Sequence, residues 1–276
     1  MARSELSSVQ MKIFQLQFRE LVETVNSKQY NKTIPYKKQN LGGIKMANGS
    51  LAVGTVIKTK YGGSIKVEKY LAEGGQGEVY VVACNGGKEK KALKWYKTAA
   101  LGKDPRAFYE NIEENIKRGS PDKAFLWPED ITEWTDGTFG YVMGLRPSSY
   151  HEITEFMLCN VRFKSFRTVV DAALRIVSAY RILHNAGYSY QDLNDGNFFV
   201  DPDTGKVLIC DNDNVAPDGY VTGIAGKPGY MAPEIVVGDA SPNSLTDRFS
   251  MAVILFILFT NTHPLKGKRY MKPALT

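Results

Sequence analysis

Three side chains that carry oxygen ligand atoms lie close together in the second half of the chain. Asp192 and Asn197 are five residues apart, and Asp211 follows the short apolar run "KVLIC". Carboxylate and amide oxygens are hard ligands that suit Mg²⁺ better than zinc. Asn197 and Asp211 could therefore hold a cation beside a polyphosphate, which leaves Asp192 to take a proton from a hydroxyl group. A polar loop is the competing interpretation, because "NDG" within this stretch is typical of an Asx turn.

Two motifs nearer the N-terminus could bind phosphate. "EGGQG" places Gly74, Gly75 and Gly77 between two expected strands, where a backbone without Cβ can approach a phosphate and point N–H groups at it. Lys94 lies in the apolar run "ALKWY", so its ammonium must either extend to solvent or meet an anion. Neither motif is specific alone. The glycine run matches neither the dinucleotide-binding fingerprint, which a helix follows, nor the P-loop, which ends in Gly-Lys-Ser/Thr.

The composition of the 276 residues is that of a globular protein, with 43% hydrophobic and 23% charged residues. The net charge of +6 comes from the N-terminal part, because residues 1–70 carry 12 Lys and Arg against 4 Asp and Glu. Such an excess could tether the chain to nucleic acid, anionic lipid or an acidic partner. No basic motif interleaved with aromatic residues accompanies it, so we expect a solvated helix and linker without specific nucleic-acid binding.

Cysteine usage and hydropathy indicate a cytoplasmic protein. The three cysteines are far apart and show neither a disulfide framework nor zinc-ligand spacing, which fits a reducing compartment. The N-terminus is polar, without the apolar segment of a signal peptide. The longest apolar run, "MAVILFILF", has about half of the ~20 residues that span a bilayer, so it predicts a buried helix and no membrane span.

The elements that must position these motifs fall into two groups. An amphipathic helix over residues 6–25 and a polar linker come first. From about residue 51, β-branched runs separated by glycine pairs predict antiparallel strands, with a hairpin around Asp136 and Gly137 and one helix around residues 108–118. Later segments are helical, over residues 166–183 and 246–260, and Ser244 or Thr246 caps the last helix. A β-rich lobe before a helical lobe predicts a ligand cleft between them.

Taken together, the order and spacing of the motifs resemble the protein kinase superfamily over roughly residues 65–267. The glycine-rich loop, Lys94, "DLNDGN", "DND" and "GYMAPE" appear in kinase order, in a style that resembles bacterial serine/threonine kinases of eukaryotic type. The resemblance implies an α+β fold with two lobes. We expect an N-terminal helix and linker over residues 1–50, an N-lobe over 51–143, and a C-lobe over 144–276. Little sequence follows "HPLKG", so we expect this C-lobe to lack its last helices, which a partner protein could complete.

The resemblance implies a kinase that transfers the γ-phosphoryl group of Mg-ATP to serine or threonine hydroxyls of a protein substrate. The catalytic residues it implies are Asp192, Lys94 and Asn197, and the Mg²⁺ ligands are Asn197 and Asp211. The residues it places around ATP are Gly74, Gly75, Gly77, Val79, Ala92, Lys94, Met143, Gly144, Arg146 and Asp211. Lys94 also needs a carboxylate from the N-lobe helix. Glu110, Glu113 and Glu114 compete for that role, and Glu113 is preferred for its distance from Lys94 along the chain.

Several residues depart from the kinase pattern. Tyr190 and Gln191 replace the usual His-Arg, so a phosphorylated activation loop has no obvious anchor and activity should not need loop phosphorylation. Asn194 replaces the usual lysine two residues after Asp192, and Lys227 replaces a threonine that meets it in the family's fold. We expect Lys227 to restore the lost charge, against the alternative of a solvent-facing lysine. A pseudokinase that binds nucleotide or a partner without transfer remains an alternative, whereas "GYMAPE" disfavours a small-molecule phosphotransferase.

Overall fold

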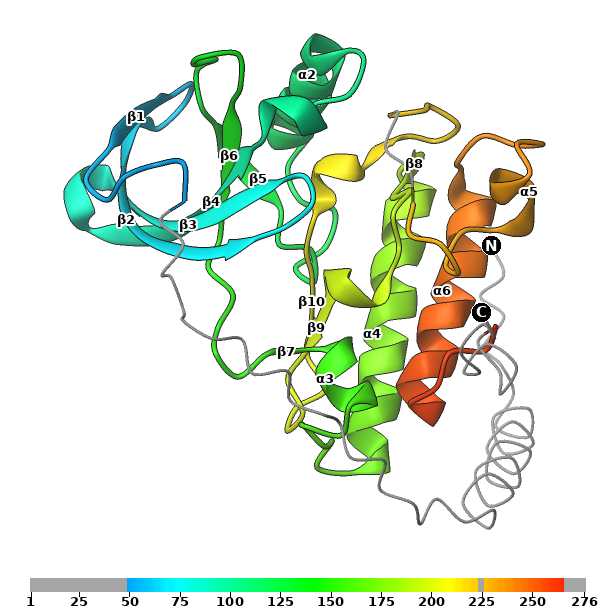
Figure 1. Ribbon diagram of the computed structural model, residues 1–276. Helices are drawn as coiled ribbons and strands as arrows, with labels where there is room; N and C mark the ends of the chain where they lie inside the picture. The colour runs from blue at the N-terminus through cyan, green and yellow to red at the C-terminus, as the bar shows by residue number, and fades with distance from the viewer. Residues whose placement is uncertain (1–48, 223–225, 266–276) are drawn as a thin grey trace, which may run out of the picture. The chain divides into compact units, whose positions relative to one another are not determined.

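The computed structural model describes residues 49–222 and 226–265, which belong to one compact unit (Figure 1). Of the helix and linker predicted over residues 1–50, the first 48 residues lie outside the described residues, as does the segment after residue 265. None of the described helices is both long enough and apolar enough to cross a bilayer.

A six-stranded antiparallel sheet forms the first lobe, in the order β1-β2-β3-β4-β6-β5. The strands are β1 (Val56–Thr59), β2 (Gly63–Glu73), β3 (Gly77–Cys84), β4 (Glu89–Tyr96), β5 (Pro128–Ile131) and β6 (Gly140–Met143). The predicted hairpin at Asp136 and Gly137 joins β5 to β6, and both of these turn residues have a positive φ. Central β4 pairs with β3 and β6, so Lys94 lies opposite Val79 on one side and Tyr141 on the other.

Helix α2 (Pro105–Arg118) is the predicted helix of this lobe. It begins where Asp104 accepts a hydrogen bond from the Ala107 N–H at 3.0 Å, and proline occupies its first turn. Its apolar residues Phe108, Tyr109 and Ile112 pack with the sheet's aromatic side chains. The amphipathic pattern of the sequence therefore fixes which face of α2 the sheet buries.

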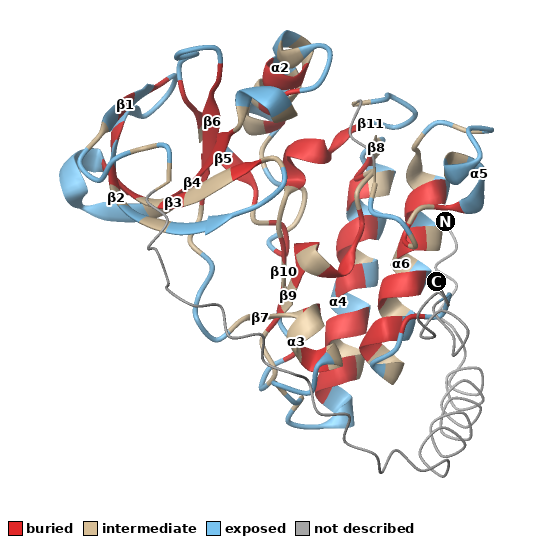
Figure 2. Ribbon diagram, in the orientation of Figure 1, coloured by how far each residue is buried: buried red, intermediate tan, exposed pale blue. Residues whose placement is uncertain are grey.

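Helices carry the second lobe. Long helices α4 (Phe166–Asn185) and α6 (Ser244–Thr260) run side by side and bury their facing sides (Figures 1 and 2). The shorter elements are α3 (Ile153–Met157), α5 (Pro233–Val236), β7 (His151–Glu152), β8 (Tyr188–Ser189), β9 (Phe198–Val200), β10 (Val207–Ile209) and β11 (Ala216–Pro217). Short 3₁₀ turns also occur, among them η3 (Asp195–Asn197) and η4 (Asn212–Asn214). One continuous apolar core lies beneath these elements, and the two-lobed α+β fold predicted from the motifs is confirmed.

The start of α6 differs from the prediction. Asn243, one residue before the helix, is the cap, since its side-chain oxygen accepts hydrogen bonds from the N–H groups of Leu245 and Thr246. The Thr246 hydroxyl oxygen in turn accepts a hydrogen bond from the Asn243 backbone N–H at 2.9 Å, so the two residues form a capping box. Ser244 is the first helical residue instead of the cap, because the box needs its two members three positions apart.

Candidate active site

The loop that carries Asp192 is held from below by Asp247 of α6. The Asp247 carboxylate is 2% exposed and accepts backbone N–H groups from Tyr190 at 2.6 Å and from Gln191 at 3.0 Å. His184 of α4 lies 3.0 Å from the same carboxylate. From above, the buried Tyr190 hydroxyl donates to the Cys210 carbonyl, one residue before Asp211. These contacts fix the loop relative to the strand that presents Asp211.

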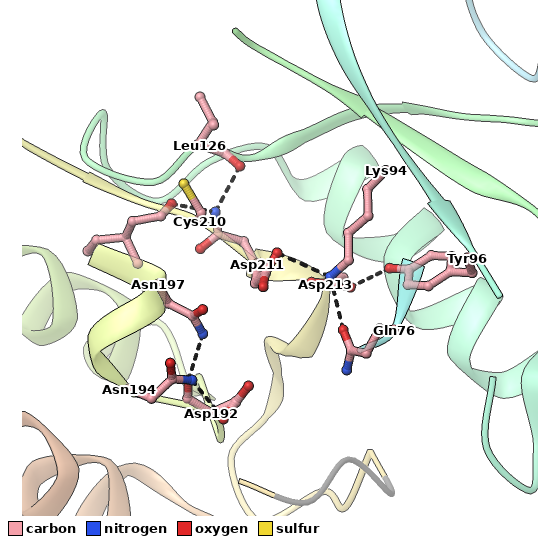
Figure 3. Close-up of polar contacts among 12 residues, drawn as sticks. Gln76, Lys94, Tyr96, Leu126, Asp192, Asn194, Asn197, Cys210, Asp211 and Asp213 are labelled. Atoms are coloured by element: carbon pink, nitrogen blue, oxygen red, sulfur yellow. Dashed lines mark hydrogen bonds and ion pairs between the residues drawn. The ribbon is translucent and has the colours of Figure 1, made fainter. Parts of the chain in front are cut away.

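Asp192 is half-buried at the inner end of this loop. Asn194 donates through its side chain to the Asp192 carboxylate at 3.1 Å, and Asn197 donates to the Asp192 carbonyl at 2.9 Å (Figure 3). Burial raises the pKa of Asp192 to about 6, and the negative charge of Asp211 acts in the same direction. The carboxylate is therefore mostly ionised at neutral pH, in the form that can accept a proton from a hydroxyl group.

Asn197 and Asp211 form a donor set that fits Mg²⁺. The Asn197 amide nitrogen is engaged by the Asp192 carbonyl, so its oxygen is available to a cation. Asp211 follows β10 with φ 54°, and this left-handed backbone turns the carboxylate back toward the lobe interface. Among the described residues, no group of three or more His, Cys, Asp or Glu could hold a metal unaided. A carboxylate and an amide suffice for Mg²⁺, because phosphate oxygens and water usually complete its coordination.

Lys94 is the cation at the centre of the site. Its ammonium lies 3.1 Å from the Asp211 carboxylate, 2.8 Å from that of Asp213, and 3.0 Å from the Gln76 side-chain oxygen (Figure 3). Burial alone would lower the pKa of Lys94, but the two carboxylates outweigh it and hold the pKa above its ordinary value. Lys94 is 5% exposed, so the alternative of a lysine whose ammonium extends to solvent is excluded.

The predicted pairing of Lys94 with Glu113 is wrong. Glu113 binds Lys60 at 2.7 Å and the Tyr61 hydroxyl at 2.9 Å, and hydrogen bonds from Lys60 lower the pKa of Glu113 to about 2. The reason is helix geometry: Asn111 faces the interface between the lobes, and a residue two positions further points about 200° away.

The other two candidate glutamates are also engaged elsewhere. Glu110 lies 3.6 Å from Arg106, and Glu114 lies 2.7 Å from Lys117, both on the exposed side of α2. No carboxylate of α2 therefore reaches Lys94.

The residues predicted around the adenine lie where the two lobes join. Val79, Ala92 and Met143 belong to one apolar cluster, and Ala92 pairs with Met143 across β4 and β6. Arg146 directs its guanidinium over the Phe199 ring at 4.4 Å. The contacts predicted between adenine and the backbone of Gly144 and Arg146 stay a prediction.

One cavity of about 470 Å³ joins the two lobes at this point. Eight predicted residues line it: Gly74, Gly75, Gly77, Val79, Lys94, Asp192, Asn197 and Asp211. The remaining lining residues are Gln76, Asn194, Gly226, Lys227 and Pro228. Lys227 reaches the cavity while its ammonium contacts Asp195 at 2.5 Å. The other predicted residues are not part of this lining: Ala92, Met143, Gly144, Arg146 and Glu113.

Sequence reasoning did not place Asp213, Gln76 or Tyr96 in the site. The Asp213 carboxylate accepts hydrogen bonds from the Lys94 ammonium and from the Tyr96 hydroxyl. The Gln76 side-chain oxygen accepts another hydrogen bond from the Lys94 ammonium. One signal was available for Tyr96, because residues two apart in a strand point to the same face. For Asp213 the only signal in the sequence was a second carboxylate in "DND", two residues after Asp211. Its burial is seen only in the structure.

The chain is similar to known protein kinases. The family model of the protein kinase domain matches residues 142–274. Maternal embryonic leucine zipper kinase of Xenopus laevis is 32% identical over 101 residues, which cover 35% of this chain and 16% of that protein. Protein kinase C delta type of Mus musculus is 26% identical over 204 residues, 72% of this chain and 30% of that protein. The chain thus spans less than a third of the length of these curated relatives.

Among solved structures, the PknI kinase domain of Mycobacterium tuberculosis matches with a TM-score of 0.59 and 24% identity, covering 81% of this chain and 82% of that one. At this identity the match shows the fold. Together with the family model, it confirms the resemblance to the protein kinase superfamily.

Proposed function

We propose that this protein kinase domain transfers the γ-phosphoryl group of Mg-ATP to serine or threonine hydroxyls of a protein. The observation that carries the proposal is the convergence of Lys94, Asp192, Asn197 and Asp211 on one cavity beneath the glycine turn. Phosphoryl transfer requires positioning and charge stabilisation more than covalent chemistry from the protein. A buried ammonium, a carboxylate poised near neutral pH and a pair of oxygen ligands are the groups it requires.

The kinase resemblance and the positions of these residues support one role for each of them. Lys94 binds the α- and β-phosphates, because it is the cation buried deepest in the cavity. Asp192 orients the acceptor hydroxyl and accepts its proton. Asn197 and Asp211 would hold Mg²⁺, which when bound offsets the charge of the phosphate oxygens. The Gly74 N–H donates to the Gly77 carbonyl at 2.8 Å and closes the turn, so the backbone N–H of Gly75 would be the group offered to the phosphates.

We also propose that transfer does not depend on phosphorylation of the activation loop. Gln191 occupies the place of the arginine that would bind a loop phosphate, and its side chain instead holds Tyr220 and Thr222 through neutral hydrogen bonds. The loop is therefore anchored without an added charge.

A nucleotide-binding pseudokinase is the second candidate. The observation that favours it is Asn194, whose neutral amide bonds Asp192 at the position where kinases usually place a lysine. Lys227 is the nearby cation that lines the cavity, and its ammonium is engaged by Asp195.

The deciding experiment measures transfer of labelled γ-phosphate from Mg-ATP to the protein itself and to a generic basic protein, beside Asp192→Asn. Loss of a positioned base lowers the rate by about 10²–10⁴-fold, so label that vanishes in the mutant supports the kinase. Nucleotide binding is measured in parallel. Binding without transfer in the wild type would favour the pseudokinase, and label that persists in Asp192→Asn would contradict the role of Asp192.

A further inference from the structure

Asp213 is a fully buried carboxylate in the turn η4, two residues after Asp211. One of its oxygens lies 2.8 Å from the Lys94 ammonium and also accepts a hydrogen bond from the Tyr96 hydroxyl (Figure 3). A carboxylate without access to water is strongly destabilising unless a cation and hydrogen-bond donors compensate it. Both compensating groups come from neighbouring positions on the same face of β4. The three residues thus form a unit that joins the two lobes.

Helix α2 supplies no charge to this unit. Its side toward η4 presents Asn111 and Asn115, whose amide nitrogens donate to the Val215 carbonyl at 2.9 Å and 2.8 Å. The helix is therefore attached to the end of the η4 turn by neutral hydrogen bonds.

The two carboxylates beside Lys94 differ in their access to solvent, and therefore in their access to a metal ion. Asp211 is 38% exposed through its side chain and is one of the two oxygen ligands that fit Mg²⁺, whereas Asp213 is 0% exposed. When Asp211 serves as a metal ligand, Asp213 is the carboxylate that stays with Lys94. Its contact is also the shorter of the two.

We propose that Asp213 is the positioning residue for Lys94, and that it replaces the helix carboxylate for which the N-lobe has no suitable residue. The inference rests on the proposed nucleotide site, because Lys94 is positioned for phosphates. It implies that the alignment of Lys94 is set by the segment that also carries Asp211, and not by the position of α2.

Binding of ATP, ADP and adenosine, each measured by titration with Mg²⁺ present, tests this role in Asp213→Asn. The proposed site places Lys94 at the phosphates and away from the adenosine, so we expect ATP and ADP to bind at least tenfold more weakly while adenosine binding changes less than twofold. Glu113→Gln is the matched control, since it removes an α2 carboxylate that lies away from Lys94, and it should leave all three affinities unchanged. Equal losses for all three ligands, or a loss of ATP affinity in Glu113→Gln, would overturn the proposal.

A second measurement, on a double variant, tests the proposal even if the single variant Asp213→Asn does not fold. Lys94→Met leaves Asp213 as a buried charge without its cation, so adding Asp213→Asn to Lys94→Met should raise the melting temperature. The double variant should also bind ATP no more weakly than Lys94→Met, because Asp213 acts through Lys94. A lower melting temperature or an additive loss of ATP affinity would show that Asp213 acts independently.

These binding assays separate this inference from the proposed reaction. A wild-type protein that binds ATP but transfers no phosphate would remove the kinase reaction, and the affinities would still decide the role of Asp213. A wild-type protein that binds no ATP would overturn both.

Discussion

Gln191 and Thr222 are joined side chain to side chain, because the Gln191 oxygen accepts a hydrogen bond from the Thr222 hydroxyl at 3.1 Å. The Gln191 amide nitrogen donates to the Tyr220 carbonyl as well. An arginine in this place could bind a loop phosphate through charge-assisted hydrogen bonds, whereas the glutamine forms neutral hydrogen bonds with the unmodified loop.

We therefore expect Thr222→Ala and Tyr220→Phe to keep the initial rate of phosphate transfer within about tenfold of the wild type. The first removes the neutral hydrogen bond from the Thr222 hydroxyl to Gln191, and the second leaves the Tyr220 carbonyl in place. Gln191→Ala removes both contacts and should lower the rate further than either. A rate that rises more than tenfold when the loop is phosphorylated, as followed by mass spectrometry, would contradict this prediction.

Lys227→Ala should lower the transfer rate by well over tenfold. Lys227 lines the same cavity as Asp192 and Lys94, and a charge that clamps a transferring phosphate contributes several kcal/mol. Lys206→Ala is the control, because it removes an exposed lysine from the turn before β10. Wild-type kinetics in Lys227→Ala would mean that its contact with Asp195 is structural only.

Glu113 should contribute stability that depends on pH. Its pKa in the folded protein is about 2, below the ordinary value, so its ion pair with Lys60 stabilises the fold fully above that ordinary value. The contribution is lost as the pH falls toward 2. Melting temperatures of the wild type and Glu113→Gln should therefore differ at pH 7 and converge as the pH approaches about 2.

Glu110→Gln is the control for this measurement, since Glu110 forms only an exposed pair with Arg106. A difference between wild type and Glu113→Gln that stays constant from pH 7 to pH 2 would show that the carboxylate's charge is not its source.

Gly77 and Gly75 should respond oppositely to alanine. A Cβ at Gly77 would lie 2.3 Å from the Trp95 carbonyl oxygen, whereas a Cβ at Gly75 meets nothing within 4 Å. We expect Gly77→Ala to lower the free energy of unfolding by about 1–3 kcal/mol, because β3 must move away from β4. Gly75→Ala should change it by less than about 0.5 kcal/mol. Chemical denaturation measures both, and equal effects would contradict the packing role of Gly77.

The sequence predicted the elements well where periodicity was strong. The strands, α2 and α4 followed from alternating or helical apolar spacing, and the order of the motifs indicated which side chains would meet in one cavity. The partner of Lys94 could not be predicted, because α2 carries acidic residues on several faces and the sequence does not say which face meets the second lobe. The burial of Asp213 depends on how the two lobes close on η4, a long-range contact that no local pattern encodes.

The hydrogen bond from Tyr190 to the Cys210 carbonyl does not depend on pH in the physiological range. Burial raises the pKa of Tyr190 well above its ordinary value, so the hydroxyl keeps its proton at every physiological pH. The hydrogen bond between the Asp192 loop and the segment that presents Asp211 therefore does not change its charge in mildly acidic surroundings. Histidine is the side chain whose ordinary pKa lies nearest this range, so it would carry a titratable group to the same buried position.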